Sequence, residues 1–378
     1  MRALTFAWAS ALIFPQATVA YSDCSTTTTI APQATPTILT GPFPSDLHGS
    51  NYTYPWPVNV FRFESQGSTH EMAFMDLPPS QSAQPESPSQ KQKVAILLHG
   101  KNFCSVTWSR TASLLSSSGY RVILPDQLGF CKSSKPSSYQ FSLPQLSLNT
   151  KNLLTTIFNT STTNTSTSSA GNGGLADAID LTVIGHSLGG MLAARFSLLY
   201  PDLVSRLVLV NPIGLEDWVS LGVPYPSVED SYLAEKASSY ASIKGYQQQT
   251  YYAGSWRESY GEWVQMLVDI YAGSQAEAFA WCQARVVDMV MTQTVVYEFA
   301  RLKVKTLLAI GQKDTTAIGK PSAPPEVQKQ LGHYDVLGKQ VAGMIPNSTL
   351  VEFANLGHAP QIQDEENFHK ALLGWLGE

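Results

Sequence analysis

Short apolar runs alternate with longer amphipathic segments along most of the chain. Strands are expected at these runs, which cover residues 94–98, 121–124, 181–184, 206–210, 305–310 and 349–353. The run at 94–98 is continuous, as in a strand buried on both faces. Two earlier segments, residues 58–63 and 70–77, instead alternate apolar and polar positions as paired edge strands do. Strands alternating with helices predict an α/β fold with a mostly parallel, eight-stranded sheet flanked by helices.

The spacing between the predicted strands is uneven. Helices are expected at residues 105–118, 143–158, 191–200 and 365–376. The interval between the strands at 206–210 and 305–310 has no clear strand, and its helical segments are rich in Trp and Tyr. It predicts a helical cap, residues 215–301, inserted after the sixth strand between two parts of the core, residues 56–214 and 302–378. Each cap aromatic either lines a pocket or belongs to the cap's own small core, and the second interpretation is favoured for any single one.

The first residues have the pattern of a secretory signal peptide. Arg2 precedes an apolar stretch over residues 3–14, and residues 18–20 offer small side chains at the expected cleavage positions. We therefore expect residues 1–20 to be removed and the mature protein to be secreted. Residues 21–55 are rich in Ser, Thr and Pro and predict an extended N-terminal arm. No later segment is apolar over enough residues to cross a bilayer, so stable membrane insertion is not expected.

Composition and charge narrow the choice of partners. Charged residues make up only 14% of the chain, below the roughly 25% usual in soluble domains. The net charge is −5 at pH 7 and the basic residues form no cluster, which argues against nucleic acid as a partner. The Asn-X-Ser/Thr pattern of N-glycosylation occurs at Asn51, Asn159, Asn164 and Asn347.

The cysteines suit a compartment in which disulfides form. Cys104 and Cys131 each lie shortly after the end of a predicted core strand. A disulfide between them is one interpretation and two buried thiols are the other, and the sequence leaves both open. Cys24 follows closely on the predicted cleavage site.

A pentapeptide at residues 185–189, Gly-His-Ser-Leu-Gly, joins a predicted buried strand to a predicted helix. A serine between two small residues at such a junction is typical of the nucleophile elbow of serine hydrolases. The turn is so tight that larger flanking side chains would clash, and it raises the hydroxyl above the end of the sheet. Ser187 is therefore the candidate nucleophile.

A serine hydroxyl needs a base and a group that orients the base. His358 is the candidate base because it follows Gly357 in the loop between the last strand and the last helix. Asp314 is the candidate acid because it comes just after the strand that follows the cap, and the order Ser, Asp, His fits the α/β-hydrolase arrangement. Glu216 and Asp217 remain rivals for the acid.

Neighbouring polar residues receive structural interpretations. His186 is expected to support the turn, His99 to be buried and hydrogen-bonded, and Asp126 to anchor a turn. The oxyanion donors should be the backbone N–H groups of Leu188 and Lys101. The Lys101 ammonium either biases the pocket toward anions or points to solvent, and we favour solvent.

Together these motifs resemble the α/β-hydrolase superfamily. The resemblance rests on Leu-Leu-His-Gly at residues 97–100, Leu-Pro-Asp-Gln-Leu-Gly-Phe at 124–130, the elbow motif at 185–191 and the Gly-His pair at 357–358. It covers roughly residues 58–377. It is similar above all to the capped branch with epoxide hydrolases, haloalkane dehalogenases, perhydrolase-type haloperoxidases and carbon–carbon bond hydrolases. Ser187 stands where the first two classes carry Asp, and Asn102 where epoxide hydrolases usually carry Pro, so neither activity is expected.

The resemblance implies a serine hydrolase that works through an acyl-enzyme without cofactor or metal. The expected substrate is a small to medium, partly apolar carboxylic ester or a lactone. A carbon–carbon bond hydrolase and a perhydrolase would use the same three residues and remain alternatives. A non-catalytic binding protein on the same fold is a further alternative. The sequence does not predict the oligomeric state.

Overall fold

The computed structural model describes residues 34–80, 91–162 and 174–377, and residues 35–378 form one compact unit. The predicted signal peptide, Cys24 and Asn164 lie outside the described residues. Asn159 falls within helix α2, although its side chain is not described.

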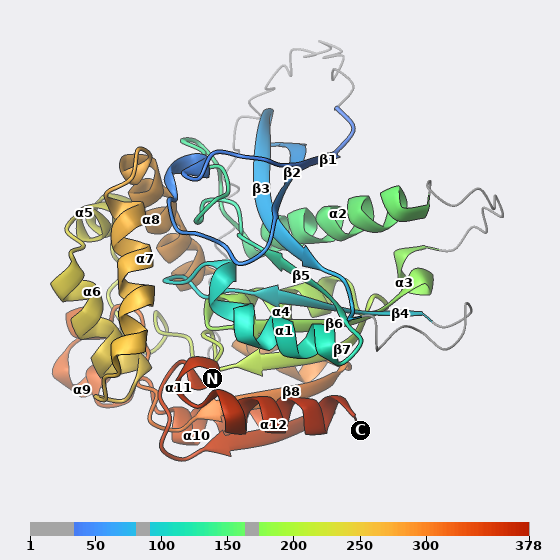
Figure 1. Ribbon diagram of the computed structural model, residues 1–378. Helices are drawn as coiled ribbons and strands as arrows, with labels where there is room; N and C mark the ends of the chain where they lie inside the picture. The colour runs from blue at the N-terminus through green and yellow to red at the C-terminus, as the bar shows by residue number, and fades with distance from the viewer. Residues whose placement is uncertain (1–33, 81–90, 163–173, 378) are drawn as a thin grey trace, which may run out of the picture. The chain divides into compact units, whose positions relative to one another are not determined.

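Nine strands in the described part of the chain form one sheet, in the order β1-β2-β3-β5-β4-β6-β7-β8-β9 (Figure 1). Strands β1 to β3 pair antiparallel, as do β3 and β5, and every other neighbouring pair is parallel. The predicted α/β fold is therefore confirmed. The strands are β1 Thr37–Thr40, β2 Val58–Ser65, β3 Ser68–Leu77, β4 Gln92–Leu98, β5 Arg121–Pro125, β6 Ile179–His186, β7 Val204–Val210, β8 Lys305–Gly311 and β9 Ser348–Phe353.

The prediction of eight strands is wrong by one, since β1 lies in the segment interpreted as an extended arm. Its four residues, Thr-Ile-Leu-Thr, are too few to show an alternating pattern. They become a strand by pairing with the free edge of β2. The strand predicted as the sixth is accordingly β7, the seventh of nine.

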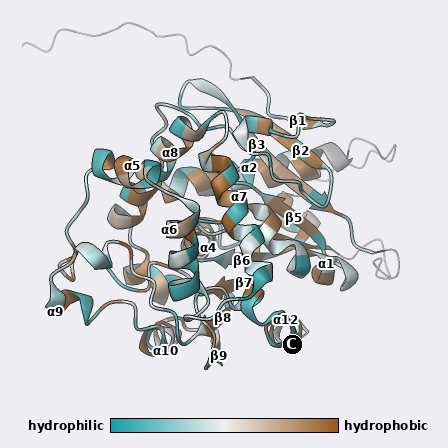
Figure 2. Cartoon of the chain, turned by 60° about the vertical axis from the view of Figure 1, so that its left-hand side comes forward, coloured by the Kyte–Doolittle hydropathy of each residue, from teal (hydrophilic) through white to brown (hydrophobic). Residues whose placement is uncertain are grey.

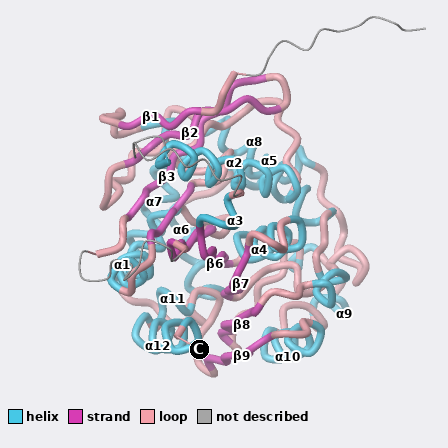
Figure 3. The backbone as a smooth tube through the Cα atoms, turned by 90° about the vertical axis from the view of Figure 1, so that its right-hand side faces the viewer, coloured by secondary structure: helices cyan, strands magenta, loops and turns pink. Residues whose placement is uncertain are grey.

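Helices cover both faces of the sheet, which explains why the central strands are apolar without interruption. Figure 3 shows α1 and α12 on one side of the strands and α4 and α10 on the other. Helix α2 packs against α4. Every residue from Val94 to Leu98 is fully buried. These helices are α1 Ser109–Ser117, α2 Leu143–Thr162, α4 Leu188–Leu199, α10 Tyr334–Met344 and α12 Glu365–Leu376.

Four longer helices lie between β7 and β8, and they gather at one end of the sheet (Figure 1). Figure 2 shows that they carry both apolar and polar residues, as expected of helices with one packed and one open face. They are α5 Val228–Lys236, α6 Tyr240–Tyr246, α7 Gly261–Tyr271 and α8 Ala276–Thr292. We refer to residues 215–301 as the cap.

Shorter helical turns connect these elements. The helix predicted at residues 105–118 begins as a 3₁₀ turn before α1, whereas the last predicted helix agrees with α12 at both ends. The short segments are α3 Leu175–Ala178, α9 Pro325–Gln328, α11 Pro360–Gln363, the 3₁₀ turns Leu47–Gly49, Ser105–Trp108, Glu258–Tyr260, Val296–Arg301 and Lys320–Ser322, and the π-helical turn Gln247–Tyr251.

Candidate active site

Ser187 occupies a strained turn between β6 and α4. Its φ of 55° and ψ of −120° lie outside the regions that residues with a side chain normally adopt. The two flanking glycines permit this turn. A Cβ on Gly185 would lie 2.1 Å from the Gly189 carbonyl oxygen, and a Cβ on Gly189 would lie 2.1 Å from the Leu98 carbonyl oxygen. The geometry agrees with the nucleophile elbow expected from the sequence.

His358 and Asp314 meet at the ends of β9 and β8. His358 Nδ1 lies 2.6 Å from Asp314 Oδ2, and the two side chains are 1% and 0% exposed. The loops can approach this closely because a Cβ on Gly311 would lie only 2.0 Å from the Gly357 carbonyl oxygen. A carboxylate oxygen accepts, so Nδ1 of His358 is the donor in this bond.

Further groups hold the Asp314 carboxylate in place. Asn211 Nδ2 donates to Oδ2 at 2.9 Å, and the Thr316 backbone N–H donates to Oδ1 at 2.8 Å. Asn211 follows β7 and also bonds both polar groups of the Gly311 backbone. The sequence analysis missed Asn211, and only its place directly after a buried strand could have drawn attention to it.

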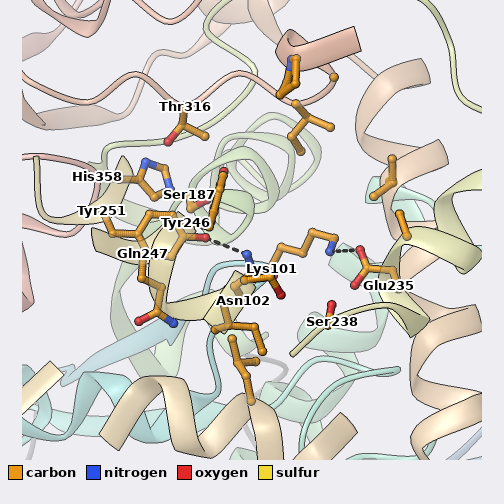
Figure 4. A pocket seen from close by; sticks show the side chains of 18 of the residues that line it. Lys101, Asn102, Ser187, Glu235, Ser238, Tyr246, Gln247, Tyr251, Thr316 and His358 are labelled. Atoms are coloured by element: carbon orange, nitrogen blue, oxygen red, sulfur yellow. Dashed lines mark hydrogen bonds and ion pairs between the residues drawn. The ribbon is translucent and has the colours of Figure 1, made fainter. Parts of the chain in front are cut away.

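The free nitrogen of His358 faces a cavity that Ser187 also lines (Figure 4). Within the described part of the chain, His358 Nε2 is buried and has no hydrogen-bond partner. The Ser187 hydroxyl does not bond to it in this rotamer. Serine–histidine bonds of this kind are often long without substrate and shorten in the complex.

His186 and His99, which lie near the site, are both buried and hydrogen-bonded. His186 Nε2 donates to the His358 backbone carbonyl at 2.8 Å. His99 Nδ1 donates to the Gly100 carbonyl, and its Nε2 accepts from the Gln127 N–H. Burial lowers the pKa of His99, and it lowers the pKa of His186 well below its ordinary value. Both imidazoles are therefore neutral supports.

The rival acids lie elsewhere. Glu216 accepts hydrogen bonds from the Trp218 indole and the Gly332 N–H, and burial raises its pKa. Asp217 accepts from Ser220 and from the Tyr297 hydroxyl. Neither carboxylate bonds to His358, so the structure brings only Asp314 to this imidazole among the three candidates.

Asp126 anchors its turn, as the sequence suggested, and bonds to two further segments as well. It is fully buried and accepts bonds from the backbone N–H groups of Ser105 and Lys132 and from the Tyr54 hydroxyl. The loops held in this way carry Cys104 and Cys131, which form a disulfide. Cys282, by contrast, is a buried thiol.

The loop after β4 lies beside the elbow. A Cβ on Gly100 would lie 3.0 Å from the Ser187 Cβ. The backbone N–H groups of Lys101, in this loop, and of Leu188, at the first position of α4, have no hydrogen-bond acceptor within residues 34–80, 91–162 and 174–377. Both N–H groups remain the candidate oxyanion donors.

The Lys101 side chain does not point to solvent, so that expectation is wrong. Its Nζ lies 2.5 Å from Glu235 Oε1, and both side chains are only 14% exposed. Glu235 belongs to α5 in the cap, and the Tyr271 hydroxyl of α7 donates to its other oxygen. The lysine turned inward because a distant helix supplies its partner, which no local pattern in the sequence could show.

The cavity has a volume of about 590 Å³ and lies between the core and the cap. Its lining comes in similar parts from the core, including Ile213 and Thr316, and from the cap, including residues of α5, α6, α7 and α8. Its apolar wall is formed by Ile213, Ile243, Leu267, Val287 and Ile318. Among the described residues, the Gln247 amide and the Thr316 hydroxyl have buried polar atoms without partners. Such a cavity suits a largely apolar small molecule with a few polar atoms.

Tyr251 covers the His358 imidazole from the cap. Its ring stacks on His358 with centroids 5.0 Å apart and planes at 27°, and Asn102 Nδ2 donates to its hydroxyl at 2.8 Å. Burial raises the pKa of Tyr251 well above its ordinary value, so the hydroxyl stays protonated. Tyr251 ends the π-helical turn Gln247–Tyr251, a kind of turn frequent at functional sites. Nothing in the sequence marks it among the many cap tyrosines.

Both interpretations of the cap aromatics hold, for different residues. Tyr246, Tyr251 and Tyr271 line the cavity. Tyr252 and Tyr260 stack with centroids 3.7 Å apart in a cluster shared with Phe103 and Ala359 of the core. Tyr232 stacks on Trp281 in a small cluster of the cap itself.

The remaining sequence candidates do not line the cavity. Asn51 and Asn347 are exposed. Among the described residues, no group of His, Cys, Asp and Glu side chains is arranged to hold a metal ion. None of the described helices is both long and apolar enough to span a membrane.

Two known proteins are similar to most of this chain. A solved structure of a probable hydrolytic enzyme from Pseudomonas aeruginosa PAO1 is 49% identical, with a TM-score of 0.77, over 86% of this chain and 96% of that one. A 2-hydroxy-6-oxononadienedioate/2-hydroxy-6-oxononatrienedioate hydrolase of Paraburkholderia xenovorans is 27% identical over 301 residues, which cover 76% of this chain and 88% of the relative.

Other similarities are shorter. An uncharacterized protein of Mycobacterium tuberculosis is 30% identical over 126 residues, or 33% of this chain, and the match spans only 31% of that relative's length. The family model described as alpha/beta hydrolase fold matches residues 94–365. The matched range contains the elbow, the cap and the His358 loop. The chain therefore belongs to the α/β-hydrolase fold family and is related to hydrolases.

Proposed function

We propose that the protein is a serine hydrolase of carboxylic esters, with Ser187 as nucleophile, His358 as base and Asp314 as the acid that orients it. One observation carries the proposal. The Nδ1 of His358 is held by Asp314, while its unpartnered Nε2 faces the cavity that Ser187 lines. An imidazole held in this orientation beside a serine in an elbow is suited to accept the hydroxyl proton.

In the proposed reaction, Ser187 Oγ attacks the ester carbonyl carbon while His358 Nε2 takes the hydroxyl proton. Asp314 stabilises the imidazolium, and the N–H groups of Leu188 and Lys101 donate to the oxyanion. The imidazolium then protonates the leaving alcohol as the carbon–oxygen bond breaks. Water attacks the acyl-enzyme with His358 again as base, which releases the acid and restores Ser187. Each oxyanion donor is expected to contribute about 3 to 4 kcal/mol to transition-state stabilisation.

The cavity supports a small to medium, partly apolar ester or lactone as substrate. Its volume of about 590 Å³ lies within the range of roughly 300 to 1,000 Å³ that is usual for small-molecule sites. Aliphatic side chains form one part of its wall, and the ion pair, tyrosines and other polar side chains form the rest. Longer acyl chains should outgrow it.

Labelling with a fluorophosphonate probe tests the nucleophile, together with a screen of p-nitrophenyl esters of increasing acyl length. We expect the wild-type protein to be labelled and to prefer short or medium chains. Ser187→Ala should lose both labelling and turnover, whereas Ser109→Ala, at the start of α1 and outside the cavity, should keep both. Undiminished ester hydrolysis by Ser187→Ala would overturn the proposal.

Cleavage of a carbon–carbon bond is the second candidate, because the Paraburkholderia xenovorans relative, aligned over 76% of this chain, is a hydrolase of that kind by its name. The same three residues would serve both reactions. Turnover of a 2-hydroxy-6-oxo-dienoate at a higher kcat/KM than any ester of the panel would favour it over ester hydrolysis.

We also propose that the protein is secreted after loss of residues 1–20. The disulfide between Cys104 and Cys131 and the exposed side chains of Asn51 and Asn347 support this, because disulfides and N-glycans both form along the secretory route. Mass spectrometry of the protein from culture medium should find Tyr21 at the N-terminus. An intact Met1 on intracellular protein would contradict it.

A further inference from the structure

The cavity contains an ion pair that the proposed reaction does not use. Lys101 Nζ and Glu235 Oε1 lie 2.5 Å apart, and both residues line the cavity. The lysine belongs to the loop beside Ser187, and the glutamate belongs to helix α5 of the cap. Figure 4 shows the lysine side chain extending away from Ser187 and His358 toward Glu235. The pair therefore faces the part of a substrate that lies away from the reacting carbonyl.

Glu235 is held in place independently of any ligand. One oxygen accepts from Lys101 and the other from the Tyr271 hydroxyl. The tyrosine comes from α7, so the carboxylate is fixed between two cap helices and the loop after β4. Because both of its oxygens are engaged, it cannot turn away when a ligand enters without losing a bond in a partly dry site.

The ion pair decides the charge of the whole cavity. Among the residues that line it, Lys101 and Glu235 are the only Lys, Arg, Asp or Glu side chains in the described part of the chain. Their charges are opposite, so the lining is neutral apart from the reacting His358. Without Glu235, the same cavity would present one buried ammonium.

We propose that Glu235 sets the charge specificity of this site, so that the cavity accepts uncharged esters and excludes esters that carry a carboxylate. A buried ammonium without a partner would bind a carboxylate through strong charge-assisted hydrogen bonds. With Glu235 in place, the Lys101 ammonium is already paired. An incoming carboxylate would lose its hydration and be repelled by the fixed Glu235 carboxylate. This inference rests on the proposed ester hydrolysis.

The test compares two esters of equal acyl length, p-nitrophenyl hexanoate and mono-p-nitrophenyl adipate, which differ by a terminal methyl or carboxylate. We expect the wild-type protein to favour the hexanoate in kcat/KM by about a hundredfold, since a buried charge without a partner is strongly disfavoured. Glu235→Gln keeps the shape of the side chain, and it should lower this preference by at least about tenfold. Using the ratio removes changes that affect both esters equally.

Two variants separate the local ion pair from the general charge of the cap. Glu229→Gln removes the same charge from an exposed position on the same helix, and it should leave the ratio within about twofold. In the double variant Glu235→Gln/Lys101→Met, the relative kcat/KM for the adipate ester should fall back toward the wild-type value, because the ammonium that attracts the carboxylate is gone. A gain that survives in the double variant would overturn the proposal.

Other outcomes also decide the question. If Glu235→Gln does not fold, as judged by its thermal melting, the wild-type protein alone suffices, since equal turnover of the two esters would overturn the inference. If neither ester is hydrolysed, the proposed function fails. The charge specificity is then tested by measuring the dissociation constants of monomethyl and dimethyl adipate for the Ser187→Ala protein. Tighter binding of the monoanion by calorimetry would overturn it, and tighter binding of the diester would support it.

Discussion

The core side of the cavity is held by backbone turns, whereas the cap side is held by side chains from distant segments. On the core side, glycines with no room for a Cβ fix the loops that carry Ser187 and His358. On the cap side, Glu235 and Tyr251 reach their places through bonds to Lys101 and Asn102, far away in the sequence. The difference suggests that the core defines the reaction and the cap defines the substrate.

Asp314→Asn should cause the largest loss of activity among the variants on the core side. The amide places a donor where His358 Nδ1–H needs an acceptor, so the imidazole would turn or change its tautomer. We expect kcat to fall by about 10³- to 10⁴-fold with little loss of stability. Steady-state kinetics on a good ester, together with thermal melting, would measure this.

Glu216→Gln is the matched control, since it alters a carboxylate once considered for the same role but bonded to Trp218 and Gly332. Its kcat should stay within about threefold of wild type. A larger loss in Glu216→Gln than in Asp314→Asn would reverse the assignment of the acid.

The sequence predicted the core side well because its signals are local. The elbow motif, the Asp after β8 and the His after β9 each depend on a strand and the few residues behind it, and parallel strands bring those ends together at one edge. The fold followed from the same alternation of strands and helices. Strand β1 was missed because Thr37–Thr40 is short and owes its conformation to the neighbouring β2.

The cap side could not be predicted in the same way. The sequence places a helical, aromatic segment between two strands, but it does not say which face of each helix turns to the cavity. Lys101 was expected to point to solvent because its partner, Glu235, is 134 positions away in the sequence and could not be recognised there. Asn211 and Tyr251 were missed for the same reason: their roles exist only through contacts with Asp314 and His358.

Glycine substitutions test the same difference between core and cap through the free energy of unfolding. In Gly311→Ala, the new Cβ would lie 2.0 Å from the Gly357 carbonyl oxygen, so the Asp314 and His358 loops must separate. We expect a loss of about 3 kcal/mol in the free energy of unfolding, with a parallel loss of activity. Chemical denaturation and ester kinetics would show both.

Gly245→Ala is the control on the cap side, because a Cβ there, on the exposed face of α6, meets no atom within 4 Å. Alanine favours the helix over glycine, so this variant should gain about 0.5 to 1 kcal/mol in stability. Equal destabilisation by the two substitutions would remove the proposed difference between core and cap.

Among the variants expected to lose activity, Tyr251→Phe should have the smallest effect, since it removes one cap hydroxyl and keeps the ring on His358. The lost bond from Asn102 should cost about 1 kcal/mol, equivalent to a decrease in kcat/KM of about fivefold. Tyr240→Phe alters an exposed cap tyrosine and should change neither stability nor kinetics. If Tyr251 only stabilises the fold, Tyr251→Phe will melt earlier while the folded enzyme keeps its full kcat. If Tyr251 positions the imidazole, kcat will fall at temperatures where the protein is fully folded, and the cap then contributes to the reaction as well as to the choice of substrate.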